Sequence, residues 1–445
     1  MMSFDEFTQA CFKASKELGC DEAEIYLGTN ERMAIGVVNG EVVNYGVNSE
    51  RGLNLRVMYR GRIGYAYTEA FEDAESLVLH AMDNAKAVEN DDVHPMQGSC
   101  VYPEIIEKPN PLLEMTDDEL INIARNLEVD IKAFDDRVNR MSKCEVNTCI
   151  RTTSIRNTRG LSADRTSKYS FVIAVPIVRQ GEEERSSLAY IFGSDFLTNY
   201  NGFVKGSVDN ALTLFNAKPV ATGEYKVIIR SDAAAEFLDS FTAMFFADNV
   251  QDGLSLFAGK LDRPIASEAV TILDDPFEAD YPRAFDDEGV PSVCTTVVEN
   301  GVLKSFLYNL KSARKDNVAS TSNAGRVSPD SPIGTMPSNF YIKKGEKSLD
   351  ELVAQMNSGL IITELGGLHA GLNTVSGDFS LIASGLLVDC GCIIRSVDQI
   401  TVAGNILSLL QNIIEVGNDL FFTLPDNGRI GSPSLLIDKL VVSGK

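Results

Sequence analysis

The chain has 445 residues, of which 44% are hydrophobic, so it is long enough for about three domain-sized units with a sizeable core. Acidic residues outnumber basic ones by 63 to 40, which gives a formal net charge of −23. Because proteins bind nucleic acids by neutralising phosphates with Lys and Arg, this charge argues against DNA or RNA as a partner, and no apolar stretch is long enough to cross a bilayer.

The N-terminus has neither a basic region nor an apolar core, so a secretory signal is not expected. Eight cysteines are scattered along the chain without a C-x-x-C pair, which favours reduced thiols. Together with the acidic composition, these features predict a cytoplasmic protein without a membrane anchor.

The first predicted unit, residues 1–92, is a helix, an antiparallel meander and a second helix. Ser3 and Glu6 form a capping box that begins the first helix. Strands are predicted at 23–29, 33–38, 41–47, 54–59 and 62–67, and a helix at 72–88. Asn39-Gly40 is a strong signal for a hairpin, because both turn positions require a positive φ.

The second predicted unit, residues 93–218, begins with a proline-rich linker and is again α plus β. Thr116 and Glu119 form a capping box for a helix that ends near Phe134. Strands are predicted at 139–157, 168–178 and 185–192, and a helix at 195–215. An alternative is that the first two units pack together as one.

The third predicted unit, residues 219–445, is rich in strands and contains a few buried helices. Helices are expected at 233–247 and 406–415, and Asn300-Gly301 predicts a hairpin. The predicted strands are 225–230, 294–299, 302–308, 340–343, 360–364, 379–388, 393–397 and 435–442. The predicted fold class is therefore α+β, with antiparallel sheets flanked by helices in the N-terminal half and a barrel-like C-terminal domain.

The usual catalytic motifs are absent. The only histidines, His80, His94 and His369, have no spacing that suits a metal-binding helix. The chain contains no G-x-S-x-G, no G-x-x-x-x-G-K-[ST] and no G-x-G-x-x-G.

Two segments are richer in chemical groups. Asp286, Asp287 and Glu288 precede Gly289, which indicates either a metal or peptide-amine site or, as the simpler interpretation, a solvated turn whose carboxylates accept hydrogen bonds from backbone N–H groups. The second segment, 366–380, has four glycines and predicts a loop shaped either for a ligand or only for structure.

These segments, in their order along the chain, resemble the TldD/PmbA peptidase family. They include Phe-Asp-Asp-Glu-Gly-Val-Pro at 285–291, Gly-Leu-His-Ala-Gly at 367–371 and Ser-Gly-Asp-Phe-Ser at 376–380. The other resembling stretches are 51–57, 157–160, 298–303, 312–314, 402–405, 416–420 and 432–437. The resemblance runs along essentially the whole chain.

The resemblance implies a branch as well as a family. TldD-type chains carry an H-E-x-x-x-H helix and a late cysteine that hold a metal, whereas PmbA/TldE-type chains keep the fold without those ligands. Here the matching helix contains Glu236 but no histidine, and residues 423–431 contain no cysteine. Glu236 alone, at an ordinary carboxylate pKa, is a weak general base.

The resemblance therefore implies a non-catalytic PmbA/TldE-like subunit. Zinc is expected in a TldD-type catalytic partner and no cofactor in this chain, the substrate is a short or unfolded peptide, and the chain alone is expected to form a homodimer. The residues expected to contact the peptide are His369, Asn373, Ser376, Asp378, Asp287 and Glu288.

Two alternatives stay open. One is an active metallopeptidase whose metal is held by His369 and the carboxylates of Asp286, Asp287, Glu288 and Asp378. The other is a homo-oligomeric binding or regulatory protein, consistent with the older naming of this family as modulators of DNA gyrase. Direct contact with DNA is disfavoured by the net charge of −23.

Overall fold

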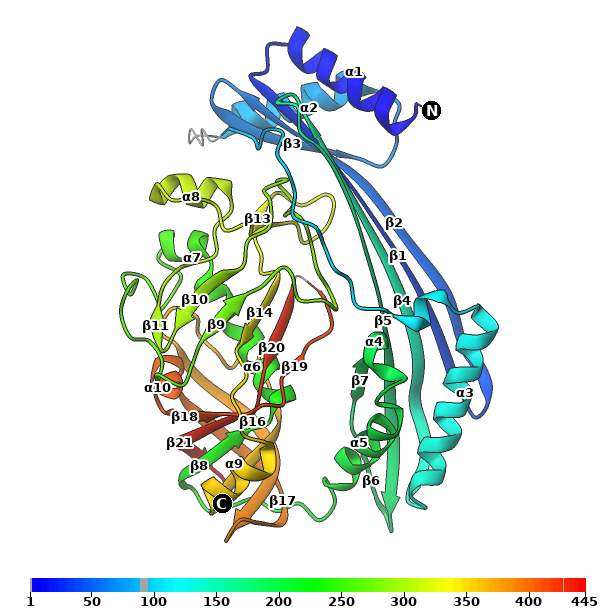
Figure 1. The fold of residues 1–445 in the computed structure, drawn as a ribbon, viewed down its shortest axis with the longest axis vertical. Helices are drawn as coiled ribbons and strands as arrows, with labels where there is room; N and C mark the ends of the chain where they lie inside the picture. Colours follow the sequence, from blue (N-terminus) through cyan, green and yellow to red (C-terminus); the bar gives the residue numbers. More distant parts are fainter. Residues whose placement is uncertain (1, 89–94, 427) are drawn as a thin grey trace.

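The computed structural model describes residues 2–88, 95–426 and 428–445. A long, curved antiparallel sheet from the N-terminal half of the chain forms one side of the molecule, and the C-terminal domain lies beside it (Figure 1). Among the described residues, no helix has the length and apolar character needed to cross a membrane.

The long sheet has the strand order β3-β2-β1-β4-β5-β6, with β7 also paired to β5. Its strands are β1 (Glu22–Val38), β2 (Glu41–Tyr59), β3 (Arg62–Thr68), β4 (Val138–Asn157), β5 (Ser162–Gln180), β6 (Glu183–Ser186) and β7 (Ala189–Phe192). The Asn39-Gly40 hairpin between β1 and β2 is confirmed, with φ values of 55° and 76°. Glu128 fixes this turn, because its carboxylate accepts the N–H groups of Asn39 and Gly40 at 2.6 and 2.8 Å.

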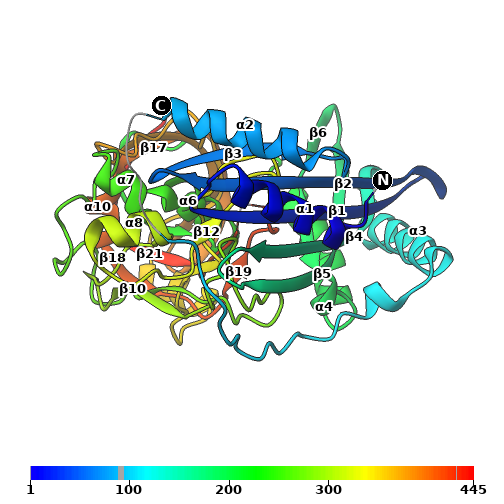
Figure 2. The ribbon, with the colours of Figure 1, turned by 90° about the horizontal axis from the view of Figure 1, so that it is seen from above.

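Helices pack on the sheet near its two ends and form a separate hydrophobic core at each. Figure 2 shows α1 and α2 at one end from above, and Figure 1 shows α3, α4 and α5 near the other. Their bounds are α1 (Phe4–Glu17), α2 (Ala74–Ala87), the 3₁₀ helix η1 (Pro111–Glu114), α3 (Asp117–Phe134), α4 (Gly193–Phe196) and α5 (Tyr200–Leu212). The predicted capping boxes at Ser3 and Thr116 are both present.

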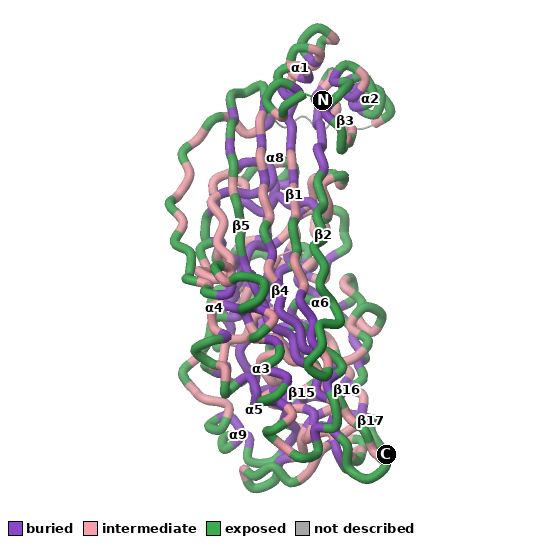
Figure 3. Tube along the Cα trace, turned by 90° about the vertical axis from the view of Figure 1, so that its right-hand side faces the viewer, coloured by how far each residue is buried: buried purple, intermediate pink, exposed green. Residues whose placement is uncertain are grey.

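Between these two cores the sheet runs with less cover. Figure 3 shows exposed residues along much of β2, where the first eleven residues are exposed and the next seven are buried. The sheet takes strands from both of the first two predicted units, because β1 pairs with β4 from Glu24 to Gly36. The predicted boundary at residues 92 and 93 lies outside the described residues.

The C-terminal domain contains a closed five-stranded barrel, which confirms the predicted α+β class with a barrel-like C-terminal half. The strands follow the order β17-β16-β15-β8-β21, and a pairing of β17 with β21 closes the ring, while β18 pairs outside it with β21. Their bounds are β8 (Gly223–Ile229), β15 (Gly359–Gly366), β16 (Asp378–Asp389), β17 (Cys392–Asn405), β18 (Ile413–Val416) and β21 (Leu435–Ser443).

A second C-terminal sheet, of order β11-β10-β9-β14-β20-β19, lies above the barrel in the view of Figure 1. It consists of β9 (Ile272–Asp274), β10 (Thr295–Glu299), β11 (Val302–Leu303), β14 (Asn339–Ile342), β19 (Phe421–Phe422) and β20 (Arg429–Ser432), and β12 (Ala324–Gly325) pairs separately with β13 (Gly334–Thr335). The helices of this half are α6 (Ser231–Thr242), η2 (Ala243–Phe245), α7 (Ala247–Gln251), α8 (Leu310–Asp316), α9 (Leu349–Met356) and α10 (Ile406–Gln411).

Several predicted elements were wrong in extent. The helix expected at 195–215 is broken, because α4 ends at Phe196 and α5 begins at Tyr200. The helix expected at 406–415 ends at Gln411, and the residues after it form β18 against β21. The strand expected at 302–308 is only the two-residue β11.

Candidate functional site

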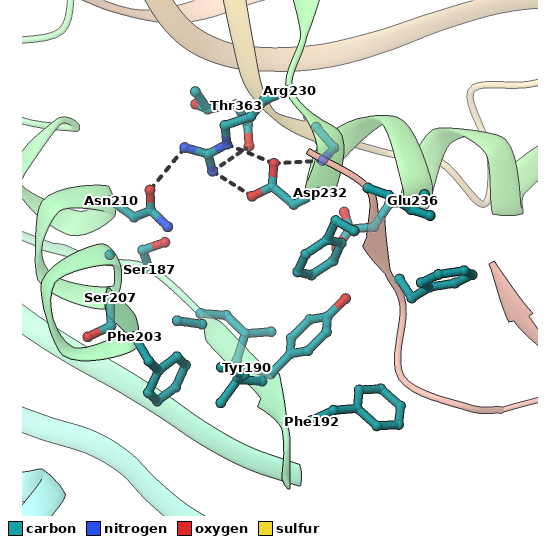
Figure 4. A pocket seen from close by; sticks show the side chains of 18 of the residues that line it. Ser187, Tyr190, Phe192, Phe203, Ser207, Asn210, Arg230, Asp232, Glu236 and Thr363 are labelled. Carbon is teal, nitrogen blue, oxygen red and sulfur yellow. Dashed lines mark hydrogen bonds and ion pairs between the residues drawn. The ribbon is translucent and has the colours of Figure 1, made fainter. Parts of the chain in front are cut away.

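A cavity of about 970 Å³ opens between the long sheet and the C-terminal domain (Figure 4). We call it the α6 cavity, because the N-terminal part of α6 forms one of its walls. The opposite wall comes from β7 and α5, and residues of β15 and β19 complete it. The cavity therefore lies where both halves of the chain contribute side chains.

Helix α6 directs its apolar face into the core and its carboxylates into the cavity. Phe237, Leu238 and Phe241 are buried in the C-terminal core. Asp232 and Glu236 are four residues apart, so they lie one turn apart on the same face of the helix. The helix therefore packs its apolar residues in the core and places two of its three acidic residues, Asp232 and Glu236, on the cavity wall.

Asp232 is held in place by Arg230. Two nitrogens of the Arg230 guanidinium donate to the two carboxylate oxygens of Asp232 at 2.7 and 2.6 Å. A third nitrogen donates to the Asn210 side chain of α5 at 2.9 Å, and Figure 4 shows this chain of contacts across the cavity. The Asp232 carboxylate is therefore neutralised and fixed by its neighbour.

Glu236 also faces the cavity, but no residue in the described part of the chain pairs with its carboxylate in this way. The side chain is accessible from the cavity, yet the surrounding protein removes much of its water, and this desolvation raises the pKa of Glu236 to about 7, with further contributions from Asp232, Glu364 and Asp239. The expectation of an ordinary carboxylate pKa was wrong. Sequence reasoning missed the shift because Glu364 and the cavity walls lie far away along the chain.

Several aromatic side chains also line the cavity. The rings of Tyr190 on β7 and Phe421 on β19 lie 5.3 Å apart across the two halves of the chain. The Arg429 guanidinium carbon lies 4.0 Å from the centre of the Phe192 ring and 4.3 Å from that of Phe422. Burial raises the pKa of Tyr190, so the phenol stays protonated. Nothing in the local sequence marked these residues, since their proximity arises from packing between the halves.

The loop residues that the sequence predicted as peptide contacts do not line the α6 cavity. His369, Asn373, Ser376 and Asp378 are exposed in the segment between β15 and β16. The Asn373 side chain accepts the N–H groups of Val375 and Ser376 at 2.9 and 3.1 Å, which shapes the loop.

Two contacts tie this loop to its surroundings. Asp378 accepts a hydrogen bond from the Asn405 side chain at 2.9 Å, and this bond, with one from Ser376, lowers the pKa of Asp378. His369 is close enough to α6 to oppose the rise in the pKa of Asp239 that burial causes. The loop therefore lies beside the helix that carries Glu236, although the cavity wall does not include it.

Residues 286–288 are buried where the long sheet meets the C-terminal domain. The prediction that this turn is exposed to solvent was therefore wrong. Arg56 of β2 pairs with Glu24 and Glu288 at 2.7 Å each, and Arg165 of β5 pairs with Asp287 at 2.7 Å. The expected backbone contacts are present, because Asp286 accepts the N–H groups of Glu288, Val290 and Ala324. Burial raises the pKa of Asp286 to about 7.

The described residues do not fit a zinc site. No group of three or more His, Cys, Asp or Glu side chains that could hold a metal ion occurs in the described ranges. The carboxylate set proposed for an active enzyme is not assembled, since Asp286, Asp287 and Glu288 belong to the junction while His369 and Asp378 lie in the loop. His94 lies outside the described residues. In the α6 cavity, Asp232 is already bound by Arg230.

Comparisons with known proteins assign the chain to a family. The family description "PmbA/TldA metallopeptidase C-terminal domain" matches residues 222–444, and "PmbA/TldA metallopeptidase domain 1" matches residues 23–85. A metalloprotease PmbA homolog of Buchnera aphidicola is 28% identical over 328 residues, which cover 73% of this chain and 70% of the relative.

Two solved structures are similar over nearly their full length. A Thermotoga maritima protein described as a candidate modulator of a DNA gyrase is 31% identical, has a TM-score of 0.88, and is matched over 99% of this chain and 100% of its own. TldE from Thermococcus kodakarensis, 21% identical with a TM-score of 0.89 over 98% of this chain and 100% of its own, shares the fold. The chain belongs to the TldD/PmbA metallopeptidase family.

Proposed function

We propose that this chain is a PmbA/TldE-type subunit of a peptidase complex and that it does not itself cleave peptides. The observation that carries the proposal is the chemistry of α6. At the place where the family's catalytic branch has its H-E-x-x-x-H helix, this helix presents Asp232 bound to Arg230, and Glu236. Because no group of three or more His, Cys, Asp or Glu side chains that could hold a metal ion occurs among the described residues, α6 does not provide the three-ligand site that zinc hydrolysis requires.

The complex would act on short or unfolded peptides, with this chain supplying part of the wall that surrounds the substrate. Among the described strands, β7 pairs only with β5, and its residues line the α6 cavity. The outer edge of β7 therefore offers backbone groups to an extended peptide, and this mode of binding tolerates many sequences. The loop residues His369, Asn373, Ser376 and Asp378 are proposed to contact the peptide at the mouth of this region. Asp287 and Glu288 are left out of this proposal, because both are buried in ion pairs with Arg165 and Arg56.

The proposal includes the partner and the metal. Zinc would be bound by a TldD-type chain, which would supply the catalytic residues, and this chain alone would form a homodimer. The complex would be cytoplasmic. This chain would not contact nucleic acid directly, because its net charge of −23 repels phosphates.

The experiment is a reconstitution with a TldD-type chain from the same organism. Each chain and the mixture are passed over a sizing column and assayed with a fluorogenic unfolded peptide. We expect co-elution and cleavage by the mixture, no cleavage by this chain alone, and zinc only in the TldD-type chain by elemental analysis.

A matched variant links cleavage to the cavity. Tyr190→Ala removes a wall residue of the α6 cavity, whereas Tyr59→Ala, at the far end of β2, does not touch it. Only the first variant is expected to change the KM of the mixture. Failure of the two chains to co-elute, or peptide cleavage by this chain with stoichiometric zinc, contradicts the proposal.

A further inference from the structure

A second cavity, of about 210 Å³, lies at the junction between the long sheet and the C-terminal domain. We call it the junction cavity. It shares no lining residue with the α6 cavity. Four arginines line it: Arg151 of β4, Arg165 of β5, and Arg283 and Arg326 of the C-terminal half. Such a gathering of guanidinium groups is unexpected in a chain with a net charge of −23.

Two of these arginines have buried N–H groups that donate no hydrogen bond to any described residue. Arg326 is 8% exposed, and its Nη1 donates to the carbonyl of Ser331 at 2.6 Å, but its Nε and Nη2 have no partner. Arg283 donates from Nη2 to the carbonyl of Ser322 at 2.8 Å, and its Nε has no partner. Because an unpartnered buried donor is costly, each such group calls for a bound acceptor.

Three carboxylates lie on the wall, those of Asp287, Glu50 and Asp426, and none of them accepts a hydrogen bond from these nitrogens. Asp287 is already bound by the Arg165 guanidinium at 2.7 Å and by the backbone N–H of Arg326 at 3.0 Å. The exposed Glu50 lies at the rim. Burial and the neighbouring Arg165 guanidinium lower the pKa of Arg283, which reflects crowding of positive charge.

We propose that the junction cavity binds a small oxyanion, a phosphate or a carboxylate, through Arg326 and Arg283. A guanidinium presents its N–H groups as a planar fork that matches the oxygen spacing of both anions. The volume accommodates such an ion together with a few waters, each of which takes about 30 Å³. Since the wall includes β4 and β5 on one side and C-terminal loops on the other, a bound anion would hold the two halves together.

The test is a calorimetric titration of the full chain at constant ionic strength. The probes are inorganic phosphate and a pair of acetylated dipeptides, one with a free C-terminal carboxylate and one with a C-terminal amide. We expect saturable heat from phosphate or from the free-carboxylate peptide, and none from the amide. The arm that binds identifies the source of the oxyanion, and no heat from either anion with the unmodified chain overturns the proposal.

Variants assign the binding to the two arginines. Arg326→Gln and Arg283→Gln are each expected to raise the dissociation constant of the anion by about tenfold or more, the usual effect of losing a charge-assisted hydrogen bond. Arg140→Gln is the matched control, because Arg140 pairs with Glu184 on the exposed part of the sheet. Melting curves without anion check that each variant is folded, and undiminished binding by both folded variants contradicts the assignment. The outcome is independent of peptide cleavage, so it is distinguishable from failure of the proposed function.

Discussion

At the scale of single residues, Glu236 shows how much a cavity changes a side chain that the sequence presents as ordinary. Its folded pKa of about 7 lies above the usual carboxylate value of 4.5. A raised folded pKa means that the contribution of Glu236 to stability is complete below the unfolded pKa and is lost as the pH rises through about 7. Above pH 7 the folded protein therefore holds an unfavourable charge.

Replacing Glu236 with Gln should remove this cost. At pH 8 we expect the free energy of unfolding to rise by about 1 kcal/mol, after discounting the pKa shift for solvent screening because the side chain is accessible from the cavity. At pH 5 the variant and the unmodified chain should be nearly equal. Urea unfolding at both pH values measures the difference, with the exposed Glu31→Gln on β1 as control. An equal effect at both pH values contradicts the shifted pKa.

The junction residues mark the limit of sequence reasoning at this scale. Asp286, Asp287 and Glu288 beside a glycine are typical of an exposed turn. The structure buries all three, because Arg56 and Arg165 come to them from strands more than a hundred residues earlier in the chain. No local pattern could have supplied those partners, whereas the hydrogen bonds of Asp286 to the N–H groups of Glu288 and Val290 are local, and backbone contacts of this kind were predicted.

At the scale of elements, the turns and caps were predictable because their signals are local. Asn39-Gly40 and the capping boxes each depend on residues within a few positions of one another. The length of β1 was not predictable. Two strands were expected at 23–29 and 33–38, but β1 is continuous because Asn30, Glu31 and Arg32 pair with Arg151, Ile150 and Cys149 of β4. The polar character of these three residues reflects exposure rather than a break in the strand.

The capping box of α3 provides a test at this scale. The Thr116 side chain accepts the N–H of Glu119, and the helix it begins carries Glu128, which holds the Asn39-Gly40 turn. Thr116→Ala should therefore lower the free energy of unfolding by about 1 kcal/mol. Thr116→Ser keeps the hydroxyl, so it should change the free energy of unfolding by only about a few tenths of a kcal/mol. If urea unfolding shows the same loss of stability in both variants, the loss does not come from the missing hydrogen bond of the cap.

At the scale of the whole molecule, the barrel and the long sheet have separate cores, so their relative placement depends on the contacts at the junction. The largest fully buried side chain there is that of Arg56, which lies between Glu24 of β1 and Glu288 of the C-terminal half. The pair Arg56–Glu288 joins positions 232 residues apart in the chain. The junction cavity is lined by Asp287, the chain neighbour of Glu288, so its geometry depends on this pair.

Arg56→Met should remove the guanidinium that lies between the buried carboxylates of Glu24 and Glu288, which costs about 3–5 kcal/mol in the free energy of unfolding. Burial already raises the pKa of Glu24 and Arg56 opposes that rise, so removing Arg56 raises the pKa further. A raised carboxyl pKa gives stability that is lost as the pH increases, so the deficit of the variant should be smaller at pH 5 than at pH 8. Urea unfolding at the two pH values measures this, with the exposed Arg140→Met as control. A deficit below 1 kcal/mol, or one that does not change with pH, would show that the two halves are held together by other contacts.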